Sequence, residues 1–407
     1  MLKLDIKSKR GILRMENYLW NWFKNTPHAK LMLKCKNSAK YKNKYHEEDN
    51  IFIHTKMVYK EVIKRYKNKV DSELFFILLM SAICHDIAKP LVRSVNDEGY
   101  AKFINHENVG FYQTLSLLKK YQLDGLNETC FRLTDDIITR ILNIVTRHNI
   151  YRYDNIKTVI ERYYSRLPEV YMFSVCDVNG RVTKEKHDLT FISNILSNGA
   201  YERELQSYKD SLIPKKNRLV FLIGPPASGK TFLSKCLFMD NEYIRVLSRD
   251  DMIETIDFKE LGLESDTNLT YNDKWDYLCK NGMQKDIDYL FLDRYKECIR
   301  NDIYTIVIDK TNTTRASRKA FLNPYFEEED LKSKFETYSK EAYVLAIPPE
   351  NILENAINRA KEGYKDVSRE IINSFINKYE NPDFSEFDKI HYVLHTDLTK
   401  YKQRLII

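Results

Sequence analysis

Apolar residues recur at helical spacing through the first half of the chain, up to about residue 205. The stretch IFIHTKMVYKEVIKRY shows this period clearly, with apolar side chains three and four positions apart. The same period runs through residues 74–88, 107–121, 134–148 and 155–178. No convincing alternation of apolar and polar residues, the pattern of a half-buried strand, appears among them. We therefore expect the N-terminal half to be an all-α bundle.

The pattern changes in the second half, where short apolar runs alternate with helical stretches. RLVFLIG, EYIRVLS, YTIVIDKTN and EAYVLAI predict buried strands, and TFLSKCLF and MQKDIDYLFLDRYKECIRN predict helices between them. Strands that alternate with helices favour an α/β domain with a parallel sheet. The polar, proline-containing segment YKDSLIPKKNR separates the two patterns. We expect one domain at 1–207, a linker at 208–216 and a second domain at 217–407.

Composition limits the class of protein. A chain of 407 residues is too long for one ordinary core, which agrees with two domains. The net charge is +7, and basic stretches such as KSKR and KYKNKYH near the N-terminus favour a polyanion, although a solvated lysine-rich face has the same composition. The seven cysteines form no CxxC pair, which indicates reduced thiols.

Nothing in the sequence predicts export or membrane insertion. The N-terminal residues MLKLDIKSKRG lack the apolar core of a signal peptide. The most apolar run, LFFILLMSAIC, is too short to span a bilayer and is expected to be a buried helix. We expect a cytoplasmic protein with no membrane association.

The segment 224–231, GPPASGKT, fits the phosphate-binding pattern GxxxxGK[ST] and lies between an apolar strand and a helix. Backbone N–H groups of such a loop and of the helix N-terminus bind phosphate oxygens. We expect ATP or another NTP with Mg²⁺, with Lys230 at the β- and γ-phosphates and the Thr231 hydroxyl on the metal. The other residues expected to bind the nucleotide are Gly224, Ala227, Ser228 and Gly229.

Two polar stretches that follow later strands indicate the reaction. In SRDD, Asp250 can accept the proton of an attacking hydroxyl, and Arg249 can contact an acceptor phosphate. In DKTN, Asp309 takes a Walker-B-like position, with Thr311 and Asn312 as candidates for substrate contacts. Taken singly, each of these residues is better explained as a helix cap or a turn residue, but together and in this order they favour a hydroxyl-directed kinase.

These pieces resemble the P-loop polynucleotide 5′-hydroxyl kinases over about residues 217–395. GPPASGKT, SRDD, DKTN and the lid-like AINRAKEGYKDVSREII carry the resemblance. It implies that Asp250 is the general base and that Arg359 is a catalytic lid arginine that neutralises charge in the transition state. Two positions depart from the family pattern: Ile253 replaces an arginine that often holds the acceptor's phosphate, and Lys361 or Lys365 would have to replace a second lid arginine.

Histidines and aspartates of the first half lie on or next to predicted helices, in IHT, CHDIAK, NHE, RHN and CDVNGR. A helical bundle can point such side chains inward to form a metal site. A single buried histidine is more often an ordinary core residue, but an adjacent His-Asp pair at the end of an apolar helix is costly to bury unless it is paired or ligated. The expected ligands of one divalent metal are His54, His85, Asp86 and Asp177, with His106 and His148 holding a second and Asp86 bridging.

This pattern resembles the HD phosphohydrolase superfamily over about residues 45–182. The stretch YHEEDNIFIHTKMV is especially similar to HD domains of RNA-end-processing and tRNA nucleotidyltransferase proteins. The resemblance implies two transition-metal ions, Mn²⁺ or similar, with Asp86 as a catalytic ligand and with Lys89 and Arg181 contacting phosphate. An HD domain followed by a polynucleotide-kinase-like domain resembles the bifunctional HD-Pnk type of end-healing enzyme.

In enzymes of that type, the HD module removes a 3′-phosphate or opens a 2′,3′-cyclic phosphate, the kinase module phosphorylates the 5′-OH, and a ligase then seals the ends. We expect this activity on RNA ends, with DNA ends left open. Two alternatives remain: an HD nucleotidase fused to a small-molecule kinase, and a non-catalytic nucleotide sensor. The sensor is the least favoured, because both sites have a complete set of expected ligands.

Overall fold

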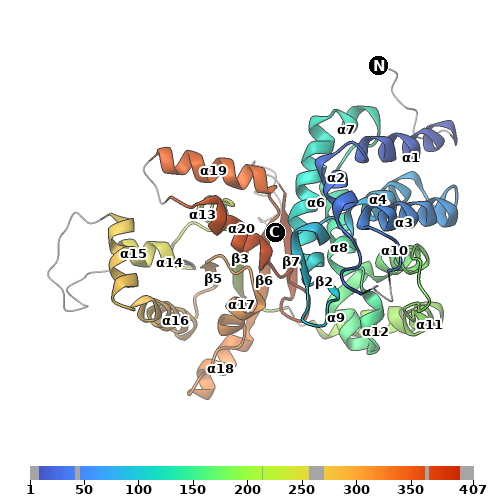
Figure 1. Cartoon of the computed structure of the whole chain (residues 1–407). Coiled ribbons are helices and arrows are strands. Elements are labelled where there is room, and N and C mark those ends of the chain that lie inside the picture. The colour runs from blue at the N-terminus through green and yellow to red at the C-terminus, as the bar shows by residue number, and fades with distance from the viewer. Residues whose placement is uncertain (1–8, 42–45, 213, 256–269, 363–365, 395–407) are drawn as a thin grey trace. The chain divides into compact units, whose positions relative to one another are not determined.

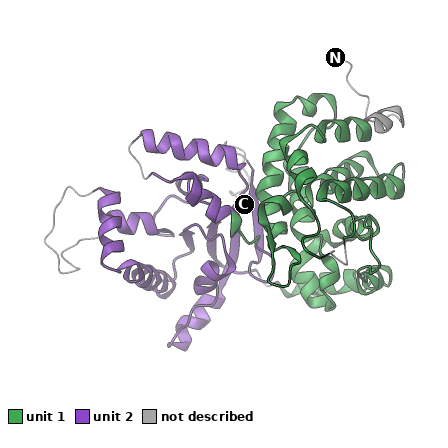
Figure 2. Ribbon diagram, viewed as in Figure 1, with its two compact units in different colours: residues 1–211, 377–381 green, residues 212–376, 382–407 purple. Residues whose placement is uncertain are grey.

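Figure 1 shows the computed structural model of the chain, which describes residues 9–41, 46–212, 214–255, 270–362 and 366–394, with side chains from Met15 onward. The chain divides into two compact units (Figure 2): unit 1 is residues 1–211 with 377–381, and unit 2 is 212–376 with 382–407. The division falls inside the segment expected as a linker, whose first residues belong to a helix that ends at Ser211. Residues 377–381 were expected in the second domain.

Unit 1 is a helical bundle with one small hairpin. Its helices and strands are α1 (Lys9–Phe23), α2 (Pro27–Lys34), α3 (Ile51–Tyr66), α4 (Ser72–Cys84), α5 (Lys89–Val92), β1 (Arg93–Val95), β2 (Ala101–Phe103), α6 (His106–Leu123), α7 (Leu126–Thr129), α8 (Asp135–Arg147), α9 (Ile156–Tyr163), α10 (Leu167–Asn179), α11 (Thr190–Ser197) and α12 (Ala200–Ser211). Two 3₁₀ turns, η1 (Ile150–Arg152) and η2 (Tyr164–Arg166), connect the helices around α9. The helical N-terminal region is therefore confirmed.

Helix α4 is the central helix of this bundle. All its residues from Phe75 to Cys84 are buried, and α3, α8 and α10 pack against it. Asp71 begins the helix by accepting the N–H of Leu74 at 2.8 Å, as an N-cap residue does. Within the described residues, Ser72–Val92 is the stretch long and apolar enough to cross a membrane, but most of it is buried inside the unit, as in the core helix of a soluble protein.

Two local features differ from the all-α prediction. β1 and β2 pair as an antiparallel hairpin, and each is too short for alternation to show in the sequence. The helix expected over 155–178 is broken, because Tyr164 has φ +46° and a residue at positive φ cannot continue a right-handed helix. The break lets α9 and α10 take different directions in the bundle.

Residues 377–381 complete the core of unit 1. Tyr379 is fully buried, and its ring lies 5.0 Å from that of Phe111 and 5.1 Å from that of Tyr112, both on α6. The backbone N–H of Asn381 donates to Oδ1 of Asn108 at 3.1 Å. These contacts join sequence positions about 270 residues apart, which no local pattern could indicate.

Unit 2 is an α/β domain with a five-stranded sheet in the order β4-β5-β3-β6-β7, in which all neighbours are parallel. The four predicted strands are present, and a fifth, β7, was not among them. The elements are β3 (Asn217–Ile223), α13 (Lys230–Leu237), β4 (Ile244–Ser248), α14 (Arg249–Thr255), α15 (Tyr271–Lys280), α16 (Gln284–Arg300), β5 (Thr305–Asp309), α17 (Arg315–Leu322), α18 (Glu329–Glu336), β6 (Tyr338–Leu345), α19 (Pro349–Lys361), α20 (Arg369–Asn377) and β7 (Lys389–Val393).

The strand register places the chemistry-bearing segments at one edge of this sheet. Asp309, the last residue of β5, is the partner of both Leu222 in β3 and Ser248 in β4. The three strands therefore end together, and the segments that follow them meet at their carboxyl ends. Ligands of open parallel sheets bind at this edge.

Candidate functional site

All six predicted metal ligands of unit 1 come together in its interior. They are supplied by five helices, and each is buried. The six are His54 in α3, His85 and Asp86 at the end of α4, His106 at the start of α6, His148 at the end of α8 and Asp177 in α10. The short connections after α4 and α8 let consecutive polar residues turn inward where an apolar helix ends.

Four of these side chains form a compact set around Nε2 of His54. This nitrogen lies 3.1 Å from Nε2 of His85, 3.1 Å from Oδ1 of Asp177 and 3.5 Å from Oδ2 of Asp86. Ligands about 2.1 Å from one metal lie about 3 Å from each other, so these separations fit a bound divalent cation. The set is the one predicted for the first metal.

The second predicted set shares Asp86. Nε2 of His106 lies 3.4 Å from Oδ1 of Asp86, and donor atoms of Asp86, His106 and His148 lie within 4.8 Å of one another. Oδ2 therefore faces the first set and Oδ1 the second, as a bridging carboxylate requires. Among the described residues, neither oxygen has a well-aligned hydrogen bond, which leaves both able to accept from water or to ligate a cation.

Charges around the two aspartates keep both ionised. Burial is the largest influence on Asp86 and would raise its pKa, but His85 and Lys89 together hold the pKa well below the usual range. The same balance applies to Asp177: burial would raise its pKa, but Arg181, His54 and His85 together hold the pKa well below the usual range. Nζ of Lys89 lies 2.8 Å from Oδ2 of Asp86, and Arg181 pairs with Asp177. Both predicted phosphate-contacting cations thus lie at the centre.

In unit 2, the loop between β3 and α13 has the backbone of a phosphate cradle. Ala227 has φ +60° and Gly229 φ +95°, so two left-handed residues fold the chain back on itself. A Cβ on Gly224 would lie 2.5 Å from Oγ of Ser228, which is buried, so only glycine fits there. Helix α13 begins directly after this turn, and the N–H groups of its first turn have no acceptor within the helix.

The loop's polar side chains are arranged for a nucleotide and its metal. Nζ of Lys230 donates to the carbonyl oxygens of Gly224 at 3.0 Å and Pro225 at 2.8 Å, so it folds back over the loop. The Thr231 hydroxyl donates to Oδ2 of Asp309 at 3.1 Å, and this hydroxyl–carboxylate pair is the one that holds Mg²⁺ in P-loop proteins. Burial raises the pKa of Asp309, a penalty that a bound cation would relieve.

Residues 219–382 match the family model described as an AAA domain. Together with the loop geometry, this match identifies the region. It is a P-loop, kinase-like nucleotide-binding domain, and such a domain implies ATP or another NTP with Mg²⁺. The match covers less than half of the chain and does not reach residues 1–211. No curated protein matches the sequence.

In the kinase-like domain, the predicted general base lies at an accessible position. Asp250 is exposed at the start of α14 and accepts the Tyr271 hydroxyl at 2.7 Å. Beside it, Nε of Arg249 contacts Oδ1 of Asp288 at 3.1 Å, and its guanidinium lies 4.9 Å from the ring centre of Trp275. The partners on α15 and α16 were not predicted, because a hydroxyl or a carboxylate on a distant helix has no local sequence signal.

The DKTN segment holds the sheet together as well as lining its edge. Asn312 is buried, and its Nδ2 donates to the carbonyl oxygens of Leu222 at 2.9 Å and Ile308 at 3.1 Å. It therefore ties β3 to β5. The carbonyl oxygen of Thr311 accepts the N–H of Gly224 at 2.9 Å. The structure gives both residues supporting roles next to the phosphate loop, and their contacts with substrate stay a prediction.

The acceptor and lid positions are less complete than the nucleotide site. Ile253 is fully buried in the core cluster formed by α14, α15 and α16, so this position serves packing. Arg359 and Lys361 are exposed in the last turn of α19. Lys365 lies outside the described residues. The lid roles of these side chains remain predictions.

Proposed function

We propose that the protein is a bifunctional nucleic-acid end-healing enzyme. Unit 1 removes a 3′-phosphate or opens a 2′,3′-cyclic phosphate, and the kinase-like domain transfers the ATP γ-phosphate to a 5′-OH end. RNA ends, cleaved tRNA among them, are the favoured substrate, and an RNA ligase in the cytoplasm would seal the product. The observation that carries the proposal is the convergence of six histidines and aspartates, from five helices, in a chain that also has a P-loop kinase-like domain.

The chemistry of unit 1 is supported by the composition of its centre. Two divalent cations of the Mn²⁺ type, held by the six side chains, would polarise a phosphate ester and supply a hydroxide nucleophile. Asp86 offers one oxygen to each set of ligands. The ammonium of Lys89 and the guanidinium of Arg181 are the groups that would bind the phosphate oxygens.

In the kinase-like domain, each step of the proposed transfer has a candidate residue. Lys230 can exchange the carbonyl oxygens of its own loop for phosphate oxygens. Thr231 and Asp309 would hold Mg²⁺. Asp250, exposed at the sheet edge, would accept the proton of the 5′-hydroxyl, with Tyr271 orienting its carboxylate. Arg359 would neutralise the charge that develops during transfer.

One observation favours a second candidate, an HD nucleotidase fused to a small-molecule kinase. The position at which polynucleotide kinases often have an arginine for the acceptor's phosphate is the buried Ile253. Arg249 already pairs with Asp288. At these two positions, no side chain is therefore already arranged to bind the phosphate of a polynucleotide acceptor.

The test uses the purified protein with two substrates. With radiolabelled ATP and Mg²⁺, we expect label on a 5′-OH oligoribonucleotide, and with Mn²⁺ we expect phosphate release from an oligoribonucleotide with a 3′-phosphate. Lys230→Ala should remove only the first activity and Asp177→Asn only the second. Transfer to nucleosides but not to oligonucleotides would reject end healing in favour of the second candidate.

A further inference from the structure

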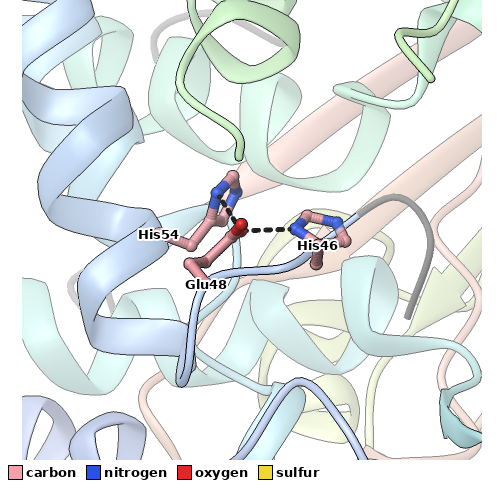
Figure 3. Close-up of side chains that lie close together, drawn as sticks. All are labelled: His46, Glu48 and His54. Atoms are coloured by element: carbon pink, nitrogen blue, oxygen red, sulfur yellow. Dashed lines mark hydrogen bonds and ion pairs between the residues drawn. The ribbon is translucent and has the colours of Figure 1, made fainter. Parts of the chain in front are cut away.

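A buried glutamate lies directly behind one of the proposed metal ligands. Figure 3 shows Glu48 between His46 and His54. Its Oε1 accepts a hydrogen bond from Nδ1 of His46 at 2.7 Å and lies 3.0 Å from Nδ1 of His54. Its Oε2 accepts the backbone N–H of Val182 at 3.2 Å. The carboxylate is 1% exposed, so protein groups rather than water surround it.

The ring of His54 therefore has different partners at its two nitrogens. Nδ1 faces Glu48, whereas Nε2 lies 3.1 Å from both His85 and Asp177. A neutral imidazole has one N–H and one lone pair. A carboxylate beside Nδ1 favours the proton at that nitrogen, which leaves the Nε2 lone pair directed at the proposed metal.

The other three histidines of the centre are held in a different way. Nδ1 of each donates to a backbone carbonyl oxygen three residues earlier in the chain. The pairs are His85 with Ala82 at 3.0 Å, His106 with Phe103 at 2.8 Å and His148 with Val145 at 2.9 Å. His54 lacks this support, since its Nδ1 has no well-aligned hydrogen bond among the described residues and Glu48 is its close partner.

His106 provides a natural comparison. Its Nδ1 lies 3.2 Å from Oε2 of Glu107, but the same nitrogen also donates to Phe103. Removing the Glu107 charge would leave that carbonyl to fix the ring and its tautomer. Removing the Glu48 charge would leave His54 without its one anionic partner at Nδ1.

We propose that Glu48, itself held by His46 and Val182, is a positioning residue that fixes the ring and the tautomer of His54. It thereby sets the affinity of the first metal site, in which His54 is joined by His85 and Asp86 at the end of α4 and by Asp177 in α10. The inference rests on the metal centre of the proposed function. Changing a partner behind a metal-binding histidine typically lowers metal affinity by about 10- to 100-fold.

The same three side chains could instead hold a cation of their own, because their donor atoms lie close together. The position of His54 argues against it. Nε2 of that ring is already directed at His85 and Asp177, and an imidazole that ligates through both nitrogens must lose both protons. A separate third site is therefore an outcome for the experiment to detect.

The experiment is a Mn²⁺ titration of the full-length protein from which bound metal has first been removed by chelation. Calorimetry and the electron paramagnetic resonance signal of free Mn²⁺ measure the binding. We expect Glu48→Gln to weaken one Mn²⁺ site by about 10- to 100-fold. Glu107→Gln removes the same charge from the neighbourhood and is expected to have a much smaller effect. His46→Ala should weaken the same site as Glu48→Gln, and His46→Asn, which can still donate to Glu48, should restore part of the affinity.

Stability measured in chelator separates positioning from folding. Without metal, we expect Glu48→Gln to melt near the wild-type temperature. Added Mn²⁺ should raise the melting temperature of the variant less than that of the wild type, since a ligand that binds more weakly stabilises the folded state less. If the variant does not fold, the two His46 variants decide: equal Mn²⁺ affinities in both would overturn the proposal.

The outcomes distinguish the inference from the function on which it rests. If the wild-type protein binds no Mn²⁺, the metal centre and the activity proposed for unit 1 are both refuted. Wild-type binding with unchanged affinity in Glu48→Gln, or an equal loss in Glu107→Gln, overturns the role of Glu48 alone. Loss of one whole Mn²⁺ equivalent, with the remaining affinities unchanged, would also overturn it and indicate a separate site.

Discussion

Replacing Asp86 with asparagine should disable unit 1 and destabilise it by a measurable amount. The substitution keeps the size of the side chain and removes one charge. Lys89 is 6% exposed, with Nζ 2.8 Å from the carboxylate, so the change leaves a buried ammonium without its nearest counter-charge. Breaking a buried pair typically costs about 3–5 kcal/mol, and the amide oxygen that remains places our expectation at the lower end, about 3 kcal/mol.

The assay measures stability and both activities in one protein. For a unit of this size, about 3 kcal/mol corresponds to a lower melting temperature by about 6–12 °C in chelator. Because Asp86 bridges the two sets of ligands, we expect loss of Mn²⁺-dependent phosphate release and retention of ATP-dependent transfer. Asp154→Asn, at an exposed position of the same unit, is the matched control and should change neither.

Two results would refute this reasoning. An unchanged melting temperature would mean that the Asp86–Lys89 pair contributes nothing to the fold. Loss of both activities in a variant that still melts cooperatively would contradict two independent sites, because Asp86 belongs to unit 1 alone.

Three further predictions concern unit 2. Lys230→Ala should abolish ATP-dependent transfer and leave phosphate release unchanged, whereas chelation of divalent metal should stop both; label transfer and phosphate release measure this. Asn312→Ala should destabilise the unit by about 2–4 kcal/mol, because two buried carbonyl oxygens lose their donor; denaturant unfolding measures the loss, and no loss would contradict the strand-linking role. Burial opposes ionisation of Glu341, but Arg218 and Lys389 hold its pKa below the ordinary value. The stability that the ionised Glu341 contributes to the folded unit is therefore present above the ordinary glutamate pKa and is lost as the pH falls below it. Glu341→Gln should therefore flatten the loss of stability as the pH falls below the ordinary glutamate pKa of about 4.3, and an unchanged slope would contradict this assignment.

The sequence predicted those parts of the fold that depend on short, continuous patterns. The strand, loop and helix around Lys230 are consecutive in sequence, so the spacing of glycines and apolar residues is enough to predict them. The His85–Asp86 pair was equally visible, because two ionisable residues directly after an apolar helix require partners in the interior.

Features that depend on tertiary contacts could not be predicted. Glu48 lies in the stretch that resembles HD domains, but its contact with His54 was not predicted, since Glu48 precedes α3 and has no helical period relative to His54. Tyr379 belongs to the core of unit 1, although in sequence it lies within the segment that matches the kinase-like domain. The burial of Ile253 depends on α15 and α16, which follow it in the chain.

The charges at the centre of unit 1 give a physical reason for a phosphate substrate. Among the described residues, the aspartates of the centre and the charged side chains named above in contact with its ligands comprise four carboxylates and two cations. Their net charge is two negative charges if the histidines are neutral, as metal ligands must be. They are Asp86, Asp177, Glu48, Glu107, Lys89 and Arg181. One divalent cation would make this buried set neutral, and a second would leave it with two positive charges. Because uncompensated buried charge is costly, the second cation is stabilised when a dianion such as a phosphate monoester binds with it. The centre is therefore matched in charge to the group that the proposed reaction removes.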